Sequence, residues 1–408
     1  MVDEETDLLI AGGGPAGMMA GLLFARAGVR TLVVEKHEDF LRDFRGDTVH
    51  PSTLQIFHEL GMLDQLLARP HDEARHLSGI IGGEKVRIAD FSGLRVVAPF
   101  IALMPQWEFL DCVADLARLY PRFVLRMKTE AVGPVVENGR VEGLRVVENG
   151  TERTIRSRLV LAADGRRSVL REAAALPLED LGAPMDVFWF RLTKLRTPDN
   201  CSTGVIATGR LLALLDRGDY WQCAYVFPKG SAEALRARGL DNFRADVART
   251  APFLAGSVAE LADWDQVKLL SVALDRLTRW HRPGLLAIGD AAHAMSPIGG
   301  VGINLAIQDA VAAANILAGP MAEGKDPDGL LERVQQRRML PTRIIQSMQR
   351  VAQNRLIDRI VLGNVPINRP PFLIRLMQRF PILQRVPARL VGLGFRPEHV
   401  RSPDAPES

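Results

Sequence analysis

The chain has 408 residues, of which 47% are hydrophobic and 24% charged, and its formal net charge is +3. These proportions are typical of globular proteins and exclude a disordered or fibrous chain, and the length is enough for two or three domains. No apolar run reaches the roughly 18–20 residues that cross a membrane, and the acidic start lacks the features of a secretion signal. We therefore expect a soluble, cytoplasmic protein.

The first forty residues show the pattern of a strand, a turn, a helix and a second strand. Residues 7–11 and 31–35 are short apolar runs typical of strands buried in a parallel sheet. Between them, Gly12-Gly13-Gly14-Pro15-Ala16-Gly17 satisfies GxGxxG and opens a helical stretch. These glycines allow a tight turn, the approach of a pyrophosphate and close packing of the helix on the strand. Glu35 at the end of the second strand suits ribose hydroxyls and would repel a 2′-phosphate, so FAD or NAD is favoured over NADP.

The middle of the chain is less regular. Residues 52–68 indicate a helix, and residues 122–163 indicate strands joined by turns. Residues 76–104 and 180–275 contain many short β-like runs separated by Gly, Pro and Asn. This order predicts a dinucleotide-binding domain that is interrupted by a sheet domain.

A second strand, loop and helix follow at residues 285–317. The strand ends in Gly289-Asp290, and a loop rich in glycine precedes an apolar helix that starts at Ile303. An aspartate at this place can bond a ligand hydroxyl, such as one on a ribityl chain. The bare amides of the loop and the helix dipole favour the negative charge of a reduced isoalloxazine. The pattern therefore favours FAD over NAD.

Together with a third motif, the two patterns above make the chain resemble the single-component FAD-dependent monooxygenases of the p-hydroxybenzoate hydroxylase type (group A). The third motif is Asp164-Gly165-Arg166-Arg167-Ser168-Val169-Leu170-Arg171, which fits the family's DG signature. Gly289-Asp290-Ala291-Ala292-His293 fits its GD signature. The three motifs stand in the family's order and cover the region from residue 5 to about residue 317.

The resemblance implies a mixed α/β (α+β) fold. A Rossmann-like FAD-binding domain would carry an inserted antiparallel-sheet substrate domain and a C-terminal helical region. We assign residues 1–75, 105–175 and 276–330 to the discontinuous FAD-binding domain. Residues 76–104 and 176–275 would form the substrate-binding sheet domain, and residues 331–408 the C-terminal helical region.

The resemblance also implies an enzyme with FAD as its cofactor and NADPH or NADH and O2 as co-substrates. A flavin C4a-hydroperoxide would oxygenate an aromatic or polycyclic small molecule. Two alternatives stay open. One is a flavin-dependent reductase, dehydrogenase or halogenase on the same scaffold, although the halogenase run Trp-x-Trp-x-Ile-Pro is missing. The other is a non-catalytic binding protein with the FAD fold.

The resemblance further implies roles for individual residues. Asp290 would bond the ribityl hydroxyls, and Pro297 would pack beside the reactive flavin carbon. His50 is the second catalytic candidate, because it lies just after Arg45 in the sequence. The expected cofactor-binding residues are Gly12, Gly14, Pro15, Ala16, Gly17, Glu35, Lys36, Arg45, Gln106, Asp164, Asp290, Gly302 and Ile303.

The aromatic runs at residues 188–190 and 220–227 are candidates for the substrate pocket. An apolar wall with a few polar groups suits a ring-shaped substrate, and we name Trp189, Gln222 and Tyr225 as substrate-binding candidates. In the second run, Trp221, Cys223, Tyr225 and Phe227 share one face. Sheet core explains each of these residues equally well.

Other residues with reactive side chains predict no further site. Cys112, Cys201 and Cys223 are isolated in the sequence, so we expect buried thiols, and no spacing predicts a metal site. His293 follows a buried strand, where a histidine is more often a hydrogen-bonded loop residue than a catalyst.

The positive charge is concentrated at the C-terminal end. Residues 329–408 contain fourteen Arg, no Lys and five acidic residues, a local charge of +9, which leaves −6 for the other 328 residues. We expect helices there, punctuated by prolines such as Pro341 and Pro366. Apolar side chains alternate with Arg375, Arg379 and Arg385. This basic amphipathic segment could touch an anionic membrane, pair with a second subunit or cap the core. The prolines favour the last two, in a monomer or homodimer, and no motif predicts binding to nucleic acid.

Overall fold

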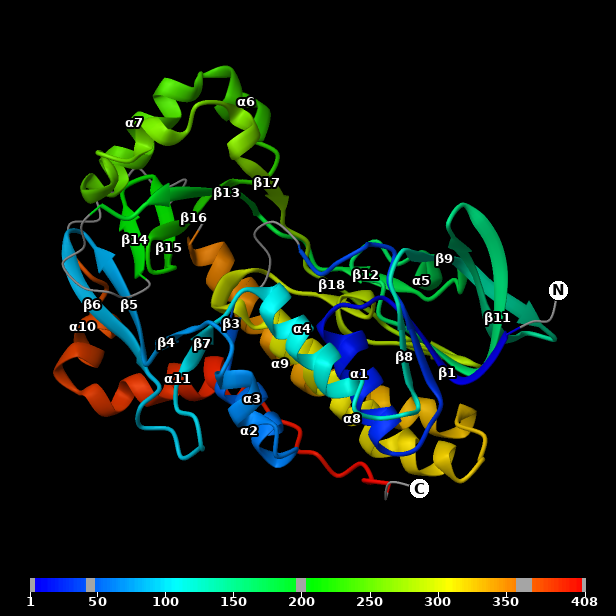
Figure 1. Ribbon diagram of the computed structural model, residues 1–408. Helices are drawn as coiled ribbons and strands as arrows, with labels where there is room; N and C mark the ends of the chain where they lie inside the picture. Colours follow the sequence, from blue (N-terminus) through cyan, green and yellow to red (C-terminus); the bar gives the residue numbers. More distant parts are fainter. Residues whose placement is uncertain (1–3, 42–47, 196–202, 357–368, 406–408) are drawn as a thin grey trace.

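The computed structural model describes residues 4–41, 48–195, 203–356 and 369–405. Its larger sheet, on the right of Figure 1, has eight strands, and its path runs β19-β20-β11-β1-β2-β8. β1 pairs in parallel with both β2 and β11, which confirms the expected strand–helix–strand unit. The strands are β1 (Glu4–Ala11), β2 (Thr31–Val34), β8 (Phe123–Arg126), β9 (Thr129–Glu137), β10 (Arg140–Glu148), β11 (Thr151–Ala162), β19 (His281–Arg282) and β20 (Leu285–Ala287).

Long helices cover this sheet and form the main core with it. α1 (Pro15–Arg26) packs against α4 (Gln106–Ala117) and α8 (Gly302–Ala322), and α8 packs in turn against α9 (Leu331–Leu356). α1 and α8 are apolar on nearly all sides because they are buried between layers. The segment Ile298–Ala322 is long and apolar enough to cross a membrane, but 78% of its apolar 18-residue stretch is buried inside the protein. It is therefore a core helix.

A seven-stranded sheet lies at the upper left of Figure 1, in the order β17-β13-β16-β15-β14-β5-β6. Its neighbours are antiparallel except for the parallel pair β14 and β5. α6 (Ala232–Ala237) and α7 (Leu240–Thr250) cover one face, so residues 180–275 contain helices besides the expected β-strands. The strands are β5 (His76–Ile81), β6 (Glu84–Asp90), β13 (Met185–Thr193), β14 (Thr203–Ala207), β15 (Arg210–Asp216), β16 (Tyr220–Pro228) and β17 (Lys268–Ser271).

Two small sheets connect these parts. β7 (Ile101–Leu103) pairs with β3 (Thr48–Val49) and β4 (Asp72–Ala74), so the end of the 76–104 segment does not join the seven-stranded sheet. The other small sheet consists of β12 (Leu178–Asp180), β18 (Asp275–Leu277) and β21 (His293–Ala294). The helix expected at residues 52–68 is divided into α2 (Pro51–Glu59) and α3 (Leu63–Leu67), because Gly61 adopts a φ of +71° between them. The short α5 (Val169–Ala173) follows the DG motif.

The C-terminal region is helical, as expected, but Pro341 does not end a helix. It lies inside α9, which continues for 26 residues, whereas Pro366 lies outside the described residues. α10 (Phe372–Arg379) and α11 (Arg385–Gly392) follow and pack on β6. The chain then returns to the eight-stranded sheet and its helices, where the amide of Ala405 donates to the carbonyl of Arg26 at the end of α1.

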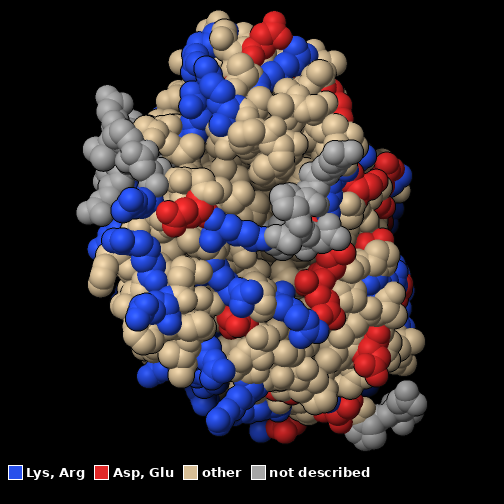
Figure 2. Space-filling view, turned by 90° about the vertical axis from the view of Figure 1, so that its left-hand side faces the viewer, with Lys and Arg blue, Asp and Glu red and all other residues tan. Residues whose placement is uncertain are grey.

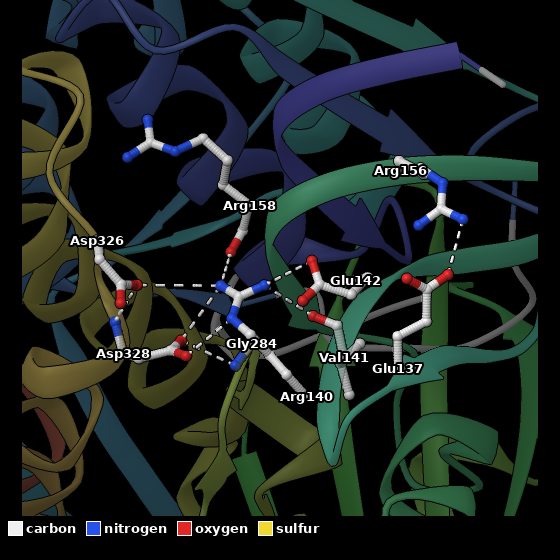
Figure 3. A network of polar contacts seen from close by, with 9 residues as sticks. All are labelled: Glu137, Arg140, Val141, Glu142, Arg156, Arg158, Gly284, Asp326 and Asp328. Atoms are coloured by element: carbon white, nitrogen blue, oxygen red, sulfur yellow. Dashed lines mark hydrogen bonds and ion pairs between the residues drawn. The ribbon is translucent and has the colours of Figure 1, made fainter.

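A polar network holds the strands around β10 against the chain that enters β20 (Figure 3). Arg140 donates from Nε to Asp328 over 2.9 Å and from Nη1 to Glu142 over 3.0 Å. Asp328 also accepts the amide of Gly284 at 2.8 Å. A Cβ at Gly284 would lie 1.9 Å from the carbonyl oxygen of Val141, so only glycine fits there. The network thereby sets the position of the strand that ends at the GD motif.

Candidate functional site

The carboxyl ends of four parallel strands meet at one edge of the eight-stranded sheet. In the strand register, Ala11 lies beside both Val34 and Ala162, and Ala162 lies beside Ala287. The glycine loop, Glu35, the DG motif and the GD motif directly follow these strands in the sequence. Sites in open α/β sheets form at such an edge, outside the carboxyl ends of the strands.

The glycine loop is shaped by two tight contacts and one open position. Gly12 has a φ of +104°, and a Cβ there would lie 2.4 Å from the carbonyl oxygen of Ala163. A Cβ at Gly17 would lie 1.9 Å from the carbonyl oxygen of Gly12, so the helix packs directly on the turn. A Cβ at Gly14 would meet nothing within 4 Å. The loop is therefore closed toward the protein and open at Gly14, where a ligand's phosphate can approach.

Residues around the loop complete the N-terminus of α1. Pro15 is its first residue and Ala16 is buried, and Pro at this position has no N–H of its own that needs a partner. The carboxylate of Glu35 is buried and accepts the amide of Gly13 at 2.8 Å from Oε2 and that of His37 at 3.1 Å from Oε1. Glu35 thus lies directly behind the loop, whereas Lys36 is exposed.

The DG and GD motifs meet through an ion pair. Arg166 donates from Nε to Asp290 Oδ2 over 3.0 Å, and both side chains are about one third exposed. Gly289 packs against Ala16 of α1 and Ala306 of α8, because a Cβ there would lie 2.9 Å and 3.2 Å from their Cβ atoms. Sequence reasoning named Asp290 but missed Arg166, although it stands inside the DG motif.

Asp164 stands behind the glycine loop, with its Cα 3.1 Å from the position of a Cβ at Gly12. Its Oδ2 accepts the amide of Leu170 at 3.3 Å, while its Oδ1 is buried without a hydrogen-bond partner in the described structure. Burial raises the pKa of Asp164, and hydrogen bonds from Ser168 and Leu170 oppose this shift only in part. An unpaired buried carboxylate oxygen costs free energy and is usual where a ligand or water completes the site.

Gln349 of α9 binds the loop that precedes α8. Gln349 donates from Nε2 to the carbonyl oxygens of Ser296 and Ile298, each at 2.9 Å, and accepts the amide of Ser296 at 3.1 Å. Pro297 lies between the two clamped residues and is half-buried. Gly302 and Ile303, also half-buried, begin α8, and Gln106 begins α4. Gln349 was not predicted, since no local motif marks it.

His50 is buried under the same loop and does not face an open pocket. It is fully buried, and its Nδ1 donates to the carbonyl oxygen of Val391 at 2.8 Å. Burial lowers the pKa of His50 to about 4, so the ring is neutral at physiological pH. A Cβ at Gly300 would lie 3.5 Å from His50 Nε2. His50 thus packs between the loop and α11, and its Nε2 is buried without a hydrogen-bond partner among the described residues. Its catalytic role stays a prediction.

Asn304 of α8 connects this histidine to the loop. Its Oδ1 accepts the amide of His50 at 2.9 Å and the hydroxyl of Thr53 at 2.8 Å. Its Nδ2 donates to the carbonyl oxygens of Thr48 at 3.2 Å and Gly300 at 3.3 Å. Asn304 was also missed, although a buried amide in a largely apolar helix was an available signal.

His293 is a structural residue, as expected. Its Nε2 lies 2.6 Å from Asp309 Oδ2, and Arg338 donates to Asp309 Oδ1 at 2.8 Å. All three side chains are buried. Burial alone would raise the pKa of Asp309, but His293 and Arg338 together hold it below its usual value. The cluster fixes the GD loop through Asp309, which also accepts the amide of Gly289 at 3.2 Å.

The three substrate candidates lie on different faces of the seven-stranded sheet. Trp189 pairs with Ala224 across the strands and belongs to a cluster that includes Ile298 of the loop before α8. Gln222 pairs with Arg191, which lies two residues after Trp189 on β13. Gln222 therefore points to the same face as Trp189. Tyr225 lies on the other face and packs edge-on against Phe243 of α7, with ring centroids 5.4 Å apart. Trp221, Cys223, Tyr225 and Phe227 are buried together in the core on this second face, and the substrate-binding role of Tyr225 stays a prediction.

The remaining predicted residues are cysteines or lie in gaps of the described structure. Arg45 and Cys201 lie outside the described residues. Cys112 and Cys223 are free and buried, as expected, and burial raises the pKa of both thiols.

The site as a whole fits FAD. The open position at Gly14 leaves room for a pyrophosphate at the N-terminus of α1. Glu35 lies where the adenine ribose would bind, and Asp290 has one carboxylate oxygen bound to Arg166, which leaves the other for a hydroxyl. The orphaned Oδ1 of Asp164 adds a further unused polar atom at the same edge.

Comparisons with known proteins agree with this geometry. The profile of the family described as "FAD binding domain" matches residues 5–348. The 6-methylpretetramide 4-monooxygenase of Streptomyces rimosus is 31% identical over 404 residues, which cover 98% of this chain and 94% of that protein. The aklavinone 12-hydroxylase DnrF of Streptomyces peucetius is 25% identical over 411 residues, 90% of this chain and 78% of that protein.

Solved structures share the fold. PqsL of P. aeruginosa in complex with 2-aminobenzoylacetate superposes with a TM-score of 0.75 at 24% identity, over 87% of this chain and 98% of that chain. OxyS anhydrotetracycline hydroxylase from Streptomyces rimosus has a TM-score of 0.74 at 22% identity, over 97% of this chain and 77% of that chain. At 22–24% identity, these solved structures show a shared fold. The family profile and the curated relatives show that the sequences are related.

Proposed function

The chain belongs to the family of FAD-dependent aromatic monooxygenases, and from this premise we propose that it hydroxylates a fused-ring phenolic substrate with NAD(P)H and O2. The observation that carries the substrate class is the match to 6-methylpretetramide 4-monooxygenase, which extends over 98% of this chain. Such a long match includes both the cofactor edge and the seven-stranded sheet. The reaction inserts one oxygen atom into a C–H bond and reduces the other to water, and NAD(P)H supplies the two electrons.

The cofactor would be held by the residues at the carboxyl edge of the sheet. Amides of the glycine loop and of α1 would bind the pyrophosphate, Glu35 the adenine ribose and Asp290 the ribityl hydroxyls. The amides of Gly302 and Ile303, at the start of α8, would bind the pyrimidine edge. When bound, FAD accepts hydride from NAD(P)H and activates O2.

The protein's own contribution is a fixed and dry environment. Gln349 holds the carbonyls on both sides of Pro297, and Asn304 holds Gly300, so both ends of the loop before α8 are restrained. The loop's own side chain Ile298 packs on the apolar cluster of the seven-stranded sheet. These contacts exclude water from the place where oxygen transfer takes place, which protects the reaction from unproductive loss of the oxidant.

The same sheet face has the shape and chemistry for a planar substrate. Trp189 and Leu211 provide apolar surface on this face, and the small side chains of Ala224 and Ala213 follow Trp189 across the neighbouring strands. The indole Nε1 of Trp189 is buried without a hydrogen-bond partner in the described structure. A phenol or carbonyl oxygen of the substrate would satisfy this N–H, and that requirement supports a role for Trp189 in orientation.

The proposal is tested by steady-state assays of the flavin-loaded protein. We expect 6-methylpretetramide or aklavinone to stimulate NAD(P)H oxidation and O2 uptake and to gain one oxygen atom by mass spectrometry. Stimulation by p-hydroxybenzoate alone would contradict the fused-ring class but keep the monooxygenase. NAD(P)H oxidation without O2 uptake or product would instead support a reductase.

A substitution tests the role of Trp189 separately. Trp189→Phe keeps the ring surface but removes the N–H, so we expect a higher KM for the oxygenated substrate and an unchanged FAD content. Tyr225→Phe, on the other face of the sheet, is the matched control and should change neither. Equal effects of both substitutions would contradict the assignment of the two faces.

A further inference from the structure

The C-terminal helices carry an unusual concentration of exposed apolar side chains. The exposed fractions are 71% for Phe372, 63% for Leu373, 50% for Phe380, 67% for Ile382 and 59% for Val386. Single exposed apolar residues are normal on a protein surface, but a contiguous group marks an interaction site. We call residues 369–389 the C-terminal surface.

Arginines alternate with these apolar side chains along the C-terminal surface, which contains no acidic residue of its own. Arg375, Arg379, Arg385 and Arg389 are exposed in the C-terminal surface, as is Arg369 at its start. No Asp or Glu occurs from residue 369 to residue 397. Figure 2 views the side of the molecule on which α10 and α11 lie, and Lys and Arg predominate over its left and lower parts. Unlike many other arginines of the described structure, these five form no ion pair with the described acidic residues.

The inner side of the same helices is already used for packing. Met377 and Ala388 are buried, and the side chain of Gln378 binds the backbone of Arg87 on the edge strand β6. The amide of Arg87 donates to Gln378 Oε1 at 3.1 Å, and Gln378 Nε2 donates to the carbonyl of Arg87 at 2.7 Å. The helices therefore cap the open edge of the sheet, and their outer side is not needed for this.

The charge pattern decides which partner fits the outer side. In a symmetric dimer the same patch meets itself, which would bring the arginines of two copies together without an acidic residue between them. An anionic lipid surface offers phosphates to the arginines and a hydrophobic boundary to Phe372, Leu373 and Ile382. We propose that the C-terminal surface binds the enzyme peripherally to membranes that contain anionic lipids.

The proposal is tested by flotation of the flavin-loaded full-length protein with vesicles. We expect binding to phosphatidylcholine vesicles that contain phosphatidylglycerol, little binding to phosphatidylcholine alone, and loss of binding at high salt. Arg375→Gln and Arg379→Gln should each weaken the partition coefficient about fivefold, since each removes one positive charge. Phe372→Ser with Ile382→Ser should weaken it further.

Matched substitutions outside the surface provide the controls. Arg153→Gln on β11 and Leu119→Ser after α4 change exposed side chains of the same kinds, and they should leave flotation unchanged. The FAD content of every variant reports correct folding, because none of the substituted residues is assigned to the cofactor. Binding that does not depend on anionic lipid, or controls that lower it equally, would overturn the proposal. A concentration-dependent dimer that Phe372→Ser abolishes would assign the surface to a second copy instead.

Discussion

Arg166 and Asp290 are 124 residues apart in the sequence, yet Arg166 Nε donates to Asp290 Oδ2 over 3.0 Å. The pair joins the DG motif to the GD motif at the cofactor edge. It occupies one oxygen of Asp290 and orients the other. The carboxylate is thus already positioned before a ligand hydroxyl arrives, which reduces the ordering cost of binding.

Replacing Asp290 should weaken FAD binding without unfolding the protein. A hydrogen bond to a charged group contributes about 1.5–3 kcal/mol, so Asp290→Ala should raise the Kd for FAD about 10–100-fold. The measurement is a fluorescence titration of the apoprotein with FAD. Arg166→Met should cause a smaller rise, and Asp241→Ala, an exposed carboxylate on α7, serves as the control. An unchanged Kd in Asp290→Ala would refute the assigned role.

The glycine loop allows stability and cofactor binding to be separated. Gly14→Ala introduces a Cβ that meets no protein atom, so the apoprotein should keep its thermal stability while FAD binding is lost. Gly12→Ala places a Cβ 2.4 Å from a carbonyl oxygen at a φ of +104°, so it should destabilise the apoprotein itself by about 1–3 kcal/mol. Thermal unfolding and flavin content are the two measurements. Similar behaviour of both variants would show that Gly14 is not at the phosphate position.

His50 should make stability depend on pH below neutrality. The pKa of its buried ring is about 4 in the folded protein, against about 6.5 in the unfolded chain, so the unfolded state binds the proton first as pH falls. This contribution is complete above pH 6.5 and decreases toward pH 4, by about 3 kcal/mol in total.

The effect is isolated by comparing variants. The difference in free energy of unfolding between the wild type and His50→Gln should therefore shrink as pH falls from 7 to 4. Urea unfolding of the two proteins across this range measures it. His58→Gln changes an exposed histidine of the same region and should show no such trend. A difference that does not vary with pH would mean that His50 is not buried as a neutral ring.

Gln349 should control how efficiently the reaction is coupled. Gln349→Leu removes three hydrogen bonds to the loop that contains Pro297, so we expect a lower stability by about 1–3 kcal/mol and a larger share of NAD(P)H consumed as H2O2. A peroxide assay during turnover measures this share. Gln336→Leu, an exposed glutamine of the same helix, should leave the coupling unchanged. Unchanged coupling in Gln349→Leu would limit its role to stability.

Local patterns were sufficient for the cofactor edge. Gly12, Gly14, Gly17, Glu35 and Asp290 each follow a strand or open a helix, and the chemistry of such positions is dictated by neighbouring residues along the chain. The parallel register then brings the strand ends to one edge. For this reason the fold class and the order of motifs could be predicted.

Long-range contacts were not predictable in the same way. Arg166 contacts Asp290, which is 124 positions away, Asn304 contacts Thr48, 256 positions away, and Gln349 contacts Ile298, 51 positions away. No spacing in the sequence reveals such contacts. His50 was a candidate for the pocket because it follows Arg45, but in the fold it is fully buried and its Nδ1 donates to the carbonyl oxygen of Val391 in α11. The side of a strand that faces the pocket was equally hidden, because alternation tells which residues share a face and not what covers it.

The sequence by itself determined that this protein binds FAD, since the motifs that contact a dinucleotide are short and local. It also determined the concentration of arginines at the C-terminal end. Only the tertiary structure decided that Trp189 faces the loop before α8 while Tyr225 packs under α7, and that the apolar side chains among the arginines are exposed. The physical reason is that a side chain's partners depend on which elements pack together, and this packing is a property of the whole chain.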